Sequence, residues 1–372
     1  MGKPVVAVVF GTRPEAIKMV PVIRALQARP GLSTLVVSTG QHKQMLAQML
    51  RRFEVKVDYE MDLMEPNQSL YRLSAKAIAA FEQVLKEGRP DMMLVQGDTT
   101  TAFLGALCAF YGRMAVGHVE AGLRTGDKYN PFPEEVNRRL ITAVADLNFC
   151  PTSGNRDNLL REGVAPGSLH VTGNTGIDTL LLAAGMEHPF PLSDLERSGR
   201  RIILVTVHRR ESFGEPMRRI FGALRDLAGA YPDHEVVYPV HLNPNVQGPA
   251  REILGGLPNV RLIEPMDYFD FVKLMGRARL ILTDSGGVQE EAPTLGVPVL
   301  VLRNETERPE AVAAGTVRLA GTGREDIVRE ARRLLDDEAE RAKLCAASNP
   351  YGDGKAAPRI AAAVEGFLSE RG

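Results

Sequence analysis

The sequence predicts an α/β protein with parallel sheets, divided into two domains. Short apolar runs rich in β-branched residues alternate with helical patterns along the whole chain, which is typical of βαβ units. The chain has 372 residues, which is long for one hydrophobic core and suits two domains. Almost every predicted strand ends in a polar or charged residue beside Gly or Pro. In open parallel sheets, ligands bind at this carboxyl end of the strands.

The first half of the chain predicts a sheet of about six strands. The first apolar run ends in a Gly-Thr-Arg-Pro-Glu segment, and a helix is expected from about Ala16, with Pro14 well placed for its start. A loop rich in Gly, Asn, Asp and Pro covers residues 125–133, and a further helix is expected near Glu134. The predicted strands cover residues 5–10, 32–38, 92–95, 115–119, 147–150 and 169–172.

The second half begins a new set of strands after a polar, proline-containing stretch at residues 187–200. A charged helix is expected over residues 324–346, and an amphipathic helix over 356–368 closes the chain. The predicted strands cover residues 201–207, 235–239, 260–263, 279–283 and 297–302. We place the domain boundary at residue 172, with a first domain of residues 1–172 and a second of 173–355.

The composition excludes several classes of protein. A formal net charge of −1 gives no general attraction to nucleic acid or to an anionic membrane. No apolar run approaches the ~18 residues that a membrane span needs, and the first run lacks a signal-peptide cleavage site. The three cysteines are scattered singly, which argues against a disulfide framework or a thiolate metal site. We therefore expect a cytoplasmic protein without nucleic-acid or membrane partners.

The stretch at residues 281–298 predicts an anion site. A buried strand turns on Ser285, Gly286 and Gly287 and enters a helical pattern. The first N–H groups of a helix lack internal partners, and two glycines let a phosphate approach the backbone. Glu291 lies about one turn further on, where a carboxylate can accept from sugar hydroxyls. The alternative for this motif is an ordinary strand–helix turn in which glycine serves packing.

The other strand-end residues divide by charge. Arg13, Lys18, His208 and Arg308 form a cationic set suited to phosphate. A second, acidic set would face another part of the ligand, where carboxylates stabilise positive charge or move protons. Its members are Asp98, Glu120 and Glu134.

Several of these residues also have a structural alternative. Asp98 precedes three threonines and could belong to a helix cap, Glu134 could complement a helix dipole, and Arg13 with Lys18 could be a solvated pair. The seven histidines are dispersed without a metal-binding pattern, and no G-x-G-x-x-G follows an early strand. These features favour phosphorylated-sugar chemistry without a metal or a nicotinamide cofactor.

Several sequence blocks resemble the non-hydrolysing UDP-N-acetylglucosamine 2-epimerases, and the resemblance runs from residue 5 to the final helix. It implies the glycosyltransferase-B architecture, in which two Rossmann-like domains face a cleft and the last helix, 356–372 here, returns to the first domain. The blocks that carry it are GTRPEAIKM (11–19), QGD (96–98), HVEAGLR (118–124), PFPEEVNR (131–138), HRRESFG (208–214), DSGGVQEEAP (284–293) and TERPE (306–310).

The reaction that this resemblance implies is reversible inversion at carbon 2 of the sugar, giving UDP-N-acetylmannosamine for cell-surface polysaccharide biosynthesis. UDP leaves to give a 2-acetamidoglucal, is re-added after protonation on the other face, and no cofactor takes part. By similarity, Asp98, Glu120 and Glu134 are the acid/base candidates, and His208 lies beside the leaving diphosphate. The implied UDP-binding residues are Arg13, Lys18, Ser285, Gly286, Gly287 and Arg308 for phosphate, Glu291 for ribose, and Phe271 with the backbone of Met266 for uracil.

Bacterial members of the family are also expected to be homodimers and to bind a second substrate molecule as an activator. Gln41, His42, Gln68, Arg209 and His241 match the activator pattern. Three other activities stay open from the sequence. They are a hydrolysing epimerase that releases UDP, a glycosyltransferase of the same fold, and a nucleotide-sugar sensor without turnover.

Overall fold

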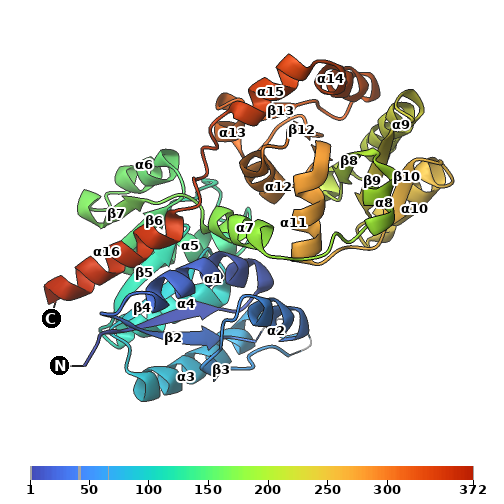
Figure 1. The fold of residues 1–372 in the computed structure, drawn as a ribbon. Helices are drawn as coiled ribbons and strands as arrows, with labels where there is room; N and C mark the ends of the chain where they lie inside the picture. Colours follow the sequence, from blue (N-terminus) through green and yellow to red (C-terminus); the bar gives the residue numbers. More distant parts are fainter. Residues whose placement is uncertain (1, 41–42, 66, 372) are drawn as a thin grey trace. The chain divides into compact units, whose positions relative to one another are not determined.

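The computed structural model describes residues 2–40, 43–65 and 67–371, which divide into two compact units. The first unit comprises Met1–Thr179 with Gly352–Gly372, and the second comprises Leu180–Tyr351. The chain passes from the first unit to the second within helix α7 (Thr175–Gly185). Both units contain a parallel sheet with helices between successive strands, so the predicted fold class is confirmed (Figure 1).

The first unit is built on a seven-stranded sheet with the order β3-β2-β1-β4-β5-β6-β7. The prediction of about six strands was one too few, because β3 has only two residues and leaves no periodic signal. The strands are β1 (Val5–Phe10), β2 (Ser33–Ser38), β3 (Tyr59–Glu60), β4 (Met92–Gln96), β5 (Ala115–Val119), β6 (Leu147–Cys150) and β7 (Leu169–Val171). All neighbouring strands in it are parallel.

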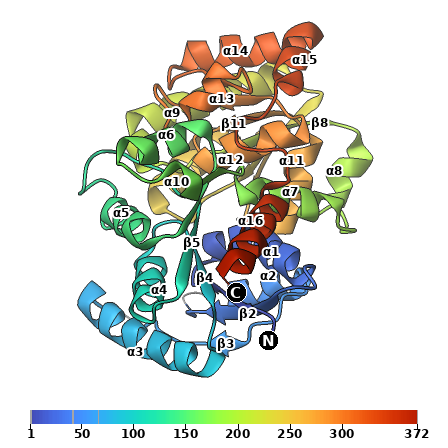
Figure 2. The ribbon, with the colours of Figure 1, turned by 90° about the vertical axis from the view of Figure 1, so that its left-hand side faces the viewer.

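Helices of the first unit follow its strands, and the last helix of the chain joins them. Helix α16 (Ala356–Arg371) packs against α1 (Arg13–Gln27), as two perpendicular views show (Figures 1 and 2). The carboxylate of Asp178 fixes the start of α16 by accepting from the N–H groups of Ala356 (3.2 Å) and Ala357 (2.8 Å). The other helices are α2 (Lys43–Arg52), α3 (Leu70–Gly88), α4 (Thr100–Tyr111), α5 (Glu134–Val144), α6 (Ser153–Arg161) and the short η1 (Pro166–Ser168).

Helix α1 begins three residues before the expected Ala16 because its first turn is capped. The Thr12 hydroxyl accepts from the N–H of Glu15 at 3.3 Å. The Glu15 carboxylate in turn accepts from the N–H groups of Gly11 (3.0 Å) and Thr12 (2.7 Å), which completes a capping box. Glu15 also accepts from the Thr99 hydroxyl at 2.6 Å, so the segments that follow β1 and β4 are joined.

The second unit has a six-stranded parallel sheet with the order β10-β9-β8-β11-β12-β13. Its strands are β8 (Arg201–Thr206), β9 (His234–Pro239), β10 (Val260–Ile263), β11 (Ala278–Thr283), β12 (Val299–Val301) and β13 (Val317–Leu319). Its helices are α8 (Ser193–Ser198), η2 (Arg210–Ser212), α9 (Glu215–Ala230), α10 (Pro244–Leu254), α11 (Tyr268–Arg277), α12 (Gly286–Glu291), η3 (Ala292–Leu295), α13 (Pro309–Ala313), α14 (Arg324–Asp336) and α15 (Glu338–Ala346).

Two expectations for the second unit were wrong. Strand β13 was missed because three residues are too few for a periodic pattern. The single charged helix over 324–346 is two helices, because Asp337 leaves the helical conformation (φ −104°, ψ 102°). The Asp337 carboxylate caps α15 by accepting from the N–H groups of Ala339 and Glu340.

In each sheet, the strands are added first on one side of the central strand and then on the other. In the first unit, β1 has β2 on one side and β4 on the other; in the second, β8 lies between β9 and β11. Such a switch point is where open α/β sheets bind ligands, because the segments that leave the two strands separate there. Strand β1 is apolar along its whole length, and every residue from 6 to 10 is buried, as expected for a sheet covered on both faces. Among the described residues, no helix is long and apolar enough to span a bilayer.

Candidate active site

Two acidic residues of the first unit, Asp98 and Glu120, lie beside its switch point, after the carboxyl ends of β4 and β5, and the third, Glu134, begins α5. Glu120 directly follows β5, and its backbone adopts a left-handed conformation with φ of 67°. Its Oε1 atom pairs with the ammonium group of Lys18 from α1, and its Oε2 atom accepts from the side-chain amide of Gln96. Both side-chain oxygens of Glu120 are therefore engaged as hydrogen-bond acceptors.

Lys18 therefore belongs to the acidic cluster rather than to a separate set of cations. The sequence does not show this pairing, because the two residues are 102 positions apart. The Lys18 and Glu120 side chains are 26% and 13% exposed, so their charges compensate each other in a largely desolvated place. Gln96 is a residue that the sequence analysis missed as a member of this cluster.

Asp98 lies at the end of β4 and pairs with Arg138 from α5. Burial raises the pKa of Asp98, the Arg138 guanidinium opposes this rise, and the charge of Glu120 adds to it. The backbone carbonyl of Asp98 accepts from the side-chain amide of Asn137 at 2.9 Å. Asp98 is thus held to α5 through its side chain and its backbone, and it does not cap α4, whose N-cap is Thr99.

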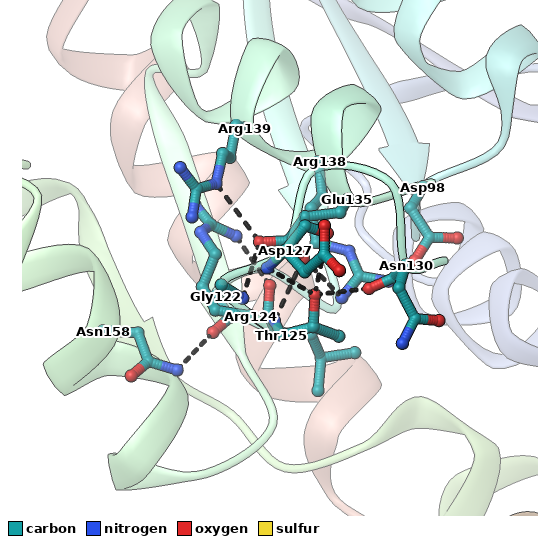
Figure 3. Close-up of polar contacts among 12 residues, drawn as sticks. Asp98, Gly122, Arg124, Thr125, Asp127, Asn130, Glu135, Arg138, Arg139 and Asn158 are labelled. Atoms are coloured by element: carbon teal, nitrogen blue, oxygen red, sulfur yellow. Dashed lines mark hydrogen bonds and ion pairs between the residues drawn. The ribbon is translucent and has the colours of Figure 1, made fainter. Parts of the chain in front are cut away.

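The two glutamates at the start of α5 have opposite environments. Glu135 is fully buried and accepts from the N–H groups of Thr125 (3.1 Å) and Gly126 (3.3 Å). Its carboxylate also forms ion pairs with Arg138 Nη1 at 3.3 Å and Arg139 Nε at 3.2 Å (Figure 3). Glu134 is half-buried, and its side chain makes no hydrogen bond or ion pair to any residue that the structure describes. Glu135 therefore fixes the loop, whereas Glu134 is available for a ligand.

The loop between β5 and α5 is tied to this network. The Thr125 hydroxyl donates to the carbonyl of Asn130 at 2.6 Å, and Arg124 pairs with Glu162 at 2.8 Å (Figure 3 shows the loop residues). Although burial alone raises the pKa of Glu135, the two loop N–H groups and Arg138 lower it below its ordinary value. The loop is therefore anchored by a buried carboxylate close to Asp98.

Residues of the second unit's switch point follow β8 and β11. Asp284 directly follows β11 and is fully buried, and its Oδ2 atom accepts from the N–H groups of His208 and Arg209, each at 2.8 Å. His208 stacks on His241, with ring centroids 5.6 Å apart and an interplanar angle of 16°. Asp284 is part of the sequence block 284–293, but its role as the anchor of His208 needed the tertiary structure.

The Ser285-Gly286-Gly287 turn lies near two guanidinium groups. A Cβ atom added to Gly286 would lie 3.5 Å from Arg209 Nη2 and 3.5 Å from Arg308 Nη2. Arg209 pairs with Glu307 at 2.5 Å, and Arg308 pairs with Glu290. An anion at this turn would lie near both guanidinium groups, but also near Glu307, whose Oε1 atom would be 3.3 Å from the same Cβ atom.

The remaining predicted site residues have varied positions. Arg13 is the first residue of α1, and Met266 and Phe271 are half-buried in the second unit. Glu291 lies near Tyr268, since burial and the Glu291 carboxylate together raise the pKa of that tyrosine. Gln68 uses its amide to donate to the carbonyl of Leu63 at 3.1 Å. Gln41 and His42 lie outside the described residues.

The chain is similar to known proteins in both sequence and structure. A sequence profile described as "UDP-N-acetylglucosamine 2-epimerase" matches residues 24–365. The chain is 51% identical to the UDP-N-acetylglucosamine 2-epimerase of Bacillus subtilis (97% of this chain, 94% of that protein) and 50% identical to that of Escherichia coli K12 (97% and 98%). The crystal structure of UDP-GlcNAc 2-epimerase from Neisseria meningitidis, bound to UDP-GlcNAc, has a TM-score of 0.84 at 44% identity and covers 98% of this chain and 100% of its own.

Proposed function

The chain belongs to the UDP-N-acetylglucosamine 2-epimerase family, and from this premise we propose that it is an isomerase that interconverts UDP-N-acetylglucosamine and UDP-N-acetylmannosamine. The observation that carries the proposal is the set of carboxylates in the first unit, where Asp98 and Glu120 follow neighbouring strands and are held by cations, and Glu134, at the start of α5, is unengaged by the described residues. Two relatives of known structure are described as bound to UDP-GlcNAc or UDP, which supports a UDP-sugar as the ligand.

The reaction proceeds without hydrolysis, through departure and return of UDP. The proton on carbon 2 is a poor acid because no carbonyl group is attached to that carbon. We propose that the bond from carbon 1 to the diphosphate oxygen breaks first, with its electron pair leaving on UDP. A carboxylate then takes the carbon 2 proton, which gives a double bond between carbons 1 and 2. Inversion requires that a proton be returned to the opposite face before UDP adds again to carbon 1.

The environments of the three carboxylates support different roles. Glu120 is fixed as an acceptor by Lys18 and Gln96, so it suits stabilisation of the positive charge that develops at carbon 1. Asp98, whose pKa is raised by burial, and the unengaged Glu134 suit the two proton transfers, one on each face of the ring. Proton transfer by positioned groups is worth typically ~10²–10⁴-fold in rate.

The second unit is proposed to bind UDP. The diphosphate would lie at the Ser285–Gly287 turn, near Arg209 and Arg308. Glu291 would accept from the ribose hydroxyls, and Phe271 with the backbone at Met266 would contact uracil. Since these side chains supply the positive charge that the diphosphate needs, we propose that turnover requires neither a metal nor a nicotinamide. Activity in EDTA equal to activity in Mg²⁺ would support this.

We further propose that the protein is a homodimer that a second UDP-sugar molecule activates. Helices α3 and α4 expose Ile78, Phe110 and Tyr111, which are 38%, 54% and 67% exposed, beside a cavity of about 420 Å³. A second copy would cover this apolar surface. His241, a proposed activator residue, stacks on His208, a proposed catalytic residue, and this contact could transmit the effect of the activator. Light scattering and the dependence of rate on substrate concentration test the two proposals.

Heavy-water NMR tests the proposed reaction against its alternatives. The protein is incubated with UDP-N-acetylglucosamine in D₂O while proton and phosphorus spectra are followed. We expect deuterium at carbon 2, two UDP-sugars at equilibrium and little free UDP. Free UDP that accumulates in step with N-acetylmannosamine would instead indicate a hydrolysing epimerase. Transfer to an added acceptor without carbon 2 exchange would indicate a glycosyltransferase, and binding without turnover a sensor.

A further inference from the structure

Asp284 has one carboxylate oxygen that no described residue satisfies. Its Oδ2 atom accepts two backbone N–H groups, but its Oδ1 atom is buried without a hydrogen-bond partner. A buried acceptor left without a donor costs roughly 1–3 kcal/mol, and more when it is charged. A donor is therefore expected to reach Oδ1 at some stage of the protein's function.

The imidazole of His208 is the donor in position to do this. His208 Nδ1 lies 3.5 Å from Asp284 Oδ1, beyond a normal hydrogen bond but within reach of a small rotation of the ring. Two other neighbours are engaged elsewhere. The Tyr238 hydroxyl donates to the carbonyl of Val207 at 2.5 Å, and the Arg209 guanidinium pairs with Glu307.

The second ring nitrogen of His208 remains available to a ligand. The His208 side chain is 38% exposed, and no described residue hydrogen-bonds to its Nε2 atom. His241 faces the ring itself rather than its edge, because the two imidazoles are nearly parallel. The ring thus has one nitrogen toward a buried carboxylate and the other free, as in the histidine–aspartate pairs that orient an imidazole for catalysis.

We propose that Asp284 is a positioning residue that keeps a proton on Nδ1 of His208 and stabilises this histidine as a cation when UDP is bound. This proposal rests on the proposed function, in which UDP must leave carbon 1. When the bond between carbon 1 and the diphosphate oxygen breaks, its electron pair stays on that oxygen. The Nε2–H of the imidazolium then donates a hydrogen bond to the new charge, and Asp284 compensates the imidazolium from the other side.

The directions of the pKa shifts in the free protein agree with this proposal. Burial lowers the pKa of His208, Asp284 raises it, and the neighbouring His241 and Arg209 lower it again. Burial likewise raises the pKa of Asp284. Without a ligand, the histidine is therefore biased toward its neutral form. The negative charge of a bound diphosphate would reverse this bias, and apo catalytic hydrogen bonds commonly shorten once the ligand is bound.

Nitrogen-15 NMR of histidine-labelled protein tests the proposal without depending on turnover. His208 is assigned by the resonance that is lost in His208→Gln. We expect neutral His208 to carry its proton on Nδ1 in the free wild-type protein, and to become doubly protonated when UDP is added at the same pH. A proton on Nε2 of the free wild-type protein, or no change with UDP, would overturn the proposal.

The Asp284→Asn variant adds a second, independent arm. The amide oxygen of Asn can still accept from the N–H groups of His208 and Arg209, so its NH₂ group would face Nδ1 and move the histidine proton to Nε2. We expect this change of tautomer, together with a fall in kcat on the order of 10²-fold or more and a much smaller change in KM. An unchanged tautomer, or a loss confined to KM, would contradict a positioning role.

His234 is an internal control in the same spectra. Its Nδ1 atom lies 2.9 Å from Asp233 Oδ1, a pair in the same unit that Asp284 does not touch. Its signals should be the same in the wild type and in Asp284→Asn. If His208 shows the expected tautomers but the wild type does not turn over UDP-N-acetylglucosamine, the proposed function fails while the Asp284–His208 pair stands.

Discussion

Replacing Arg138 with methionine should change the pH dependence of the reaction as well as its rate. Arg138 is the cation paired with Asp98, and the two side chains are only 11% and 26% exposed. At about 4 Å and an effective dielectric constant of about 20, such a pair attracts by about 4 kcal/mol. If roughly half of this is offset by hydration in the variant, about 2 kcal/mol of support for the charged form of Asp98 is lost.

This loss predicts a specific change in the pH profile. The pKa of Asp98, already raised by burial, should rise further, because the one cause that lowers it most is removed. On the acid side of the profile, kcat/KM should fall by about 10- to 100-fold, since each 1.4 kcal/mol is a factor of about ten. Raising the pH should recover much of the activity, because Asp98 ionises again.

Arg139→Met is the matched control for Arg138→Met. Arg139 pairs with the same buried carboxylate, Glu135, at 3.2 Å, but it does not contact Asp98. Arg139→Met should therefore leave the pH dependence of kcat/KM unchanged. The assay is kcat/KM for epimerisation from pH 5 to pH 9, with the melting temperature of each variant measured in parallel. The reasoning is refuted if Arg138→Met lowers kcat/KM equally at every pH, or if Arg139→Met shifts the profile in the same way.

Three further predictions concern stability and binding. Burial lowers the pKa of His118 to about 4, although its ring hydrogen-bonds to the Gly97 carbonyl. On acidification the histidine is therefore protonated in the unfolded chain before it is protonated in the folded protein, and up to about 3 kcal/mol of stability should be lost as the pH falls from about 6.5 to about 4. Denaturation of the His118→Asn variant should lack this pH-dependent loss. Glu134→Gln should lower kcat by at least ~10²-fold with an unchanged melting temperature, because the side chain has no partner among the described residues; a variant that melts earlier would indicate a structural role. Gly286→Ala should keep the fold, because the added Cβ atom would lie 3.3 Å or more from its neighbours. It should weaken UDP binding, measured by calorimetry, by about tenfold or more, because that atom would occupy the approach of a phosphate. Unaltered affinity would place the diphosphate elsewhere.

Most strands could be predicted because a sheet covered on both faces needs uninterrupted apolar runs. Strands β1, β5, β6 and β10 begin and end at the predicted residues. The failures are local: β3 and β13 are too short for a pattern, and the break at Asp337 depends on one capping side chain. Sequence patterns record burial well, but they do not record where a single hydrogen bond ends a helix.

The candidate site could be predicted in its positions but not in its pairings. Residues at strand ends are visible in the sequence, and Asp98 and Glu120 come together because parallel strands share a carboxyl edge. The partners Lys18 and Arg138 are contributed by other helices, and only the fold brings them there. Adjacent glutamates at the start of α5 are likewise equivalent in a sequence, yet the structure buries one and leaves the other half-exposed.

Oxygen-18 scrambling tests the central claim that UDP leaves carbon 1 and returns to it. UDP-N-acetylglucosamine is labelled with oxygen-18 in the bridge between carbon 1 and the β-phosphorus, and the label is followed by phosphorus NMR during turnover. We predict that the label moves into the non-bridging positions of the β-phosphate, because the released phosphate group can rotate before it is re-added. Inversion at carbon 2 with the label retained entirely in the bridge would contradict the account, which requires a released β-phosphate that rotates before it is re-added.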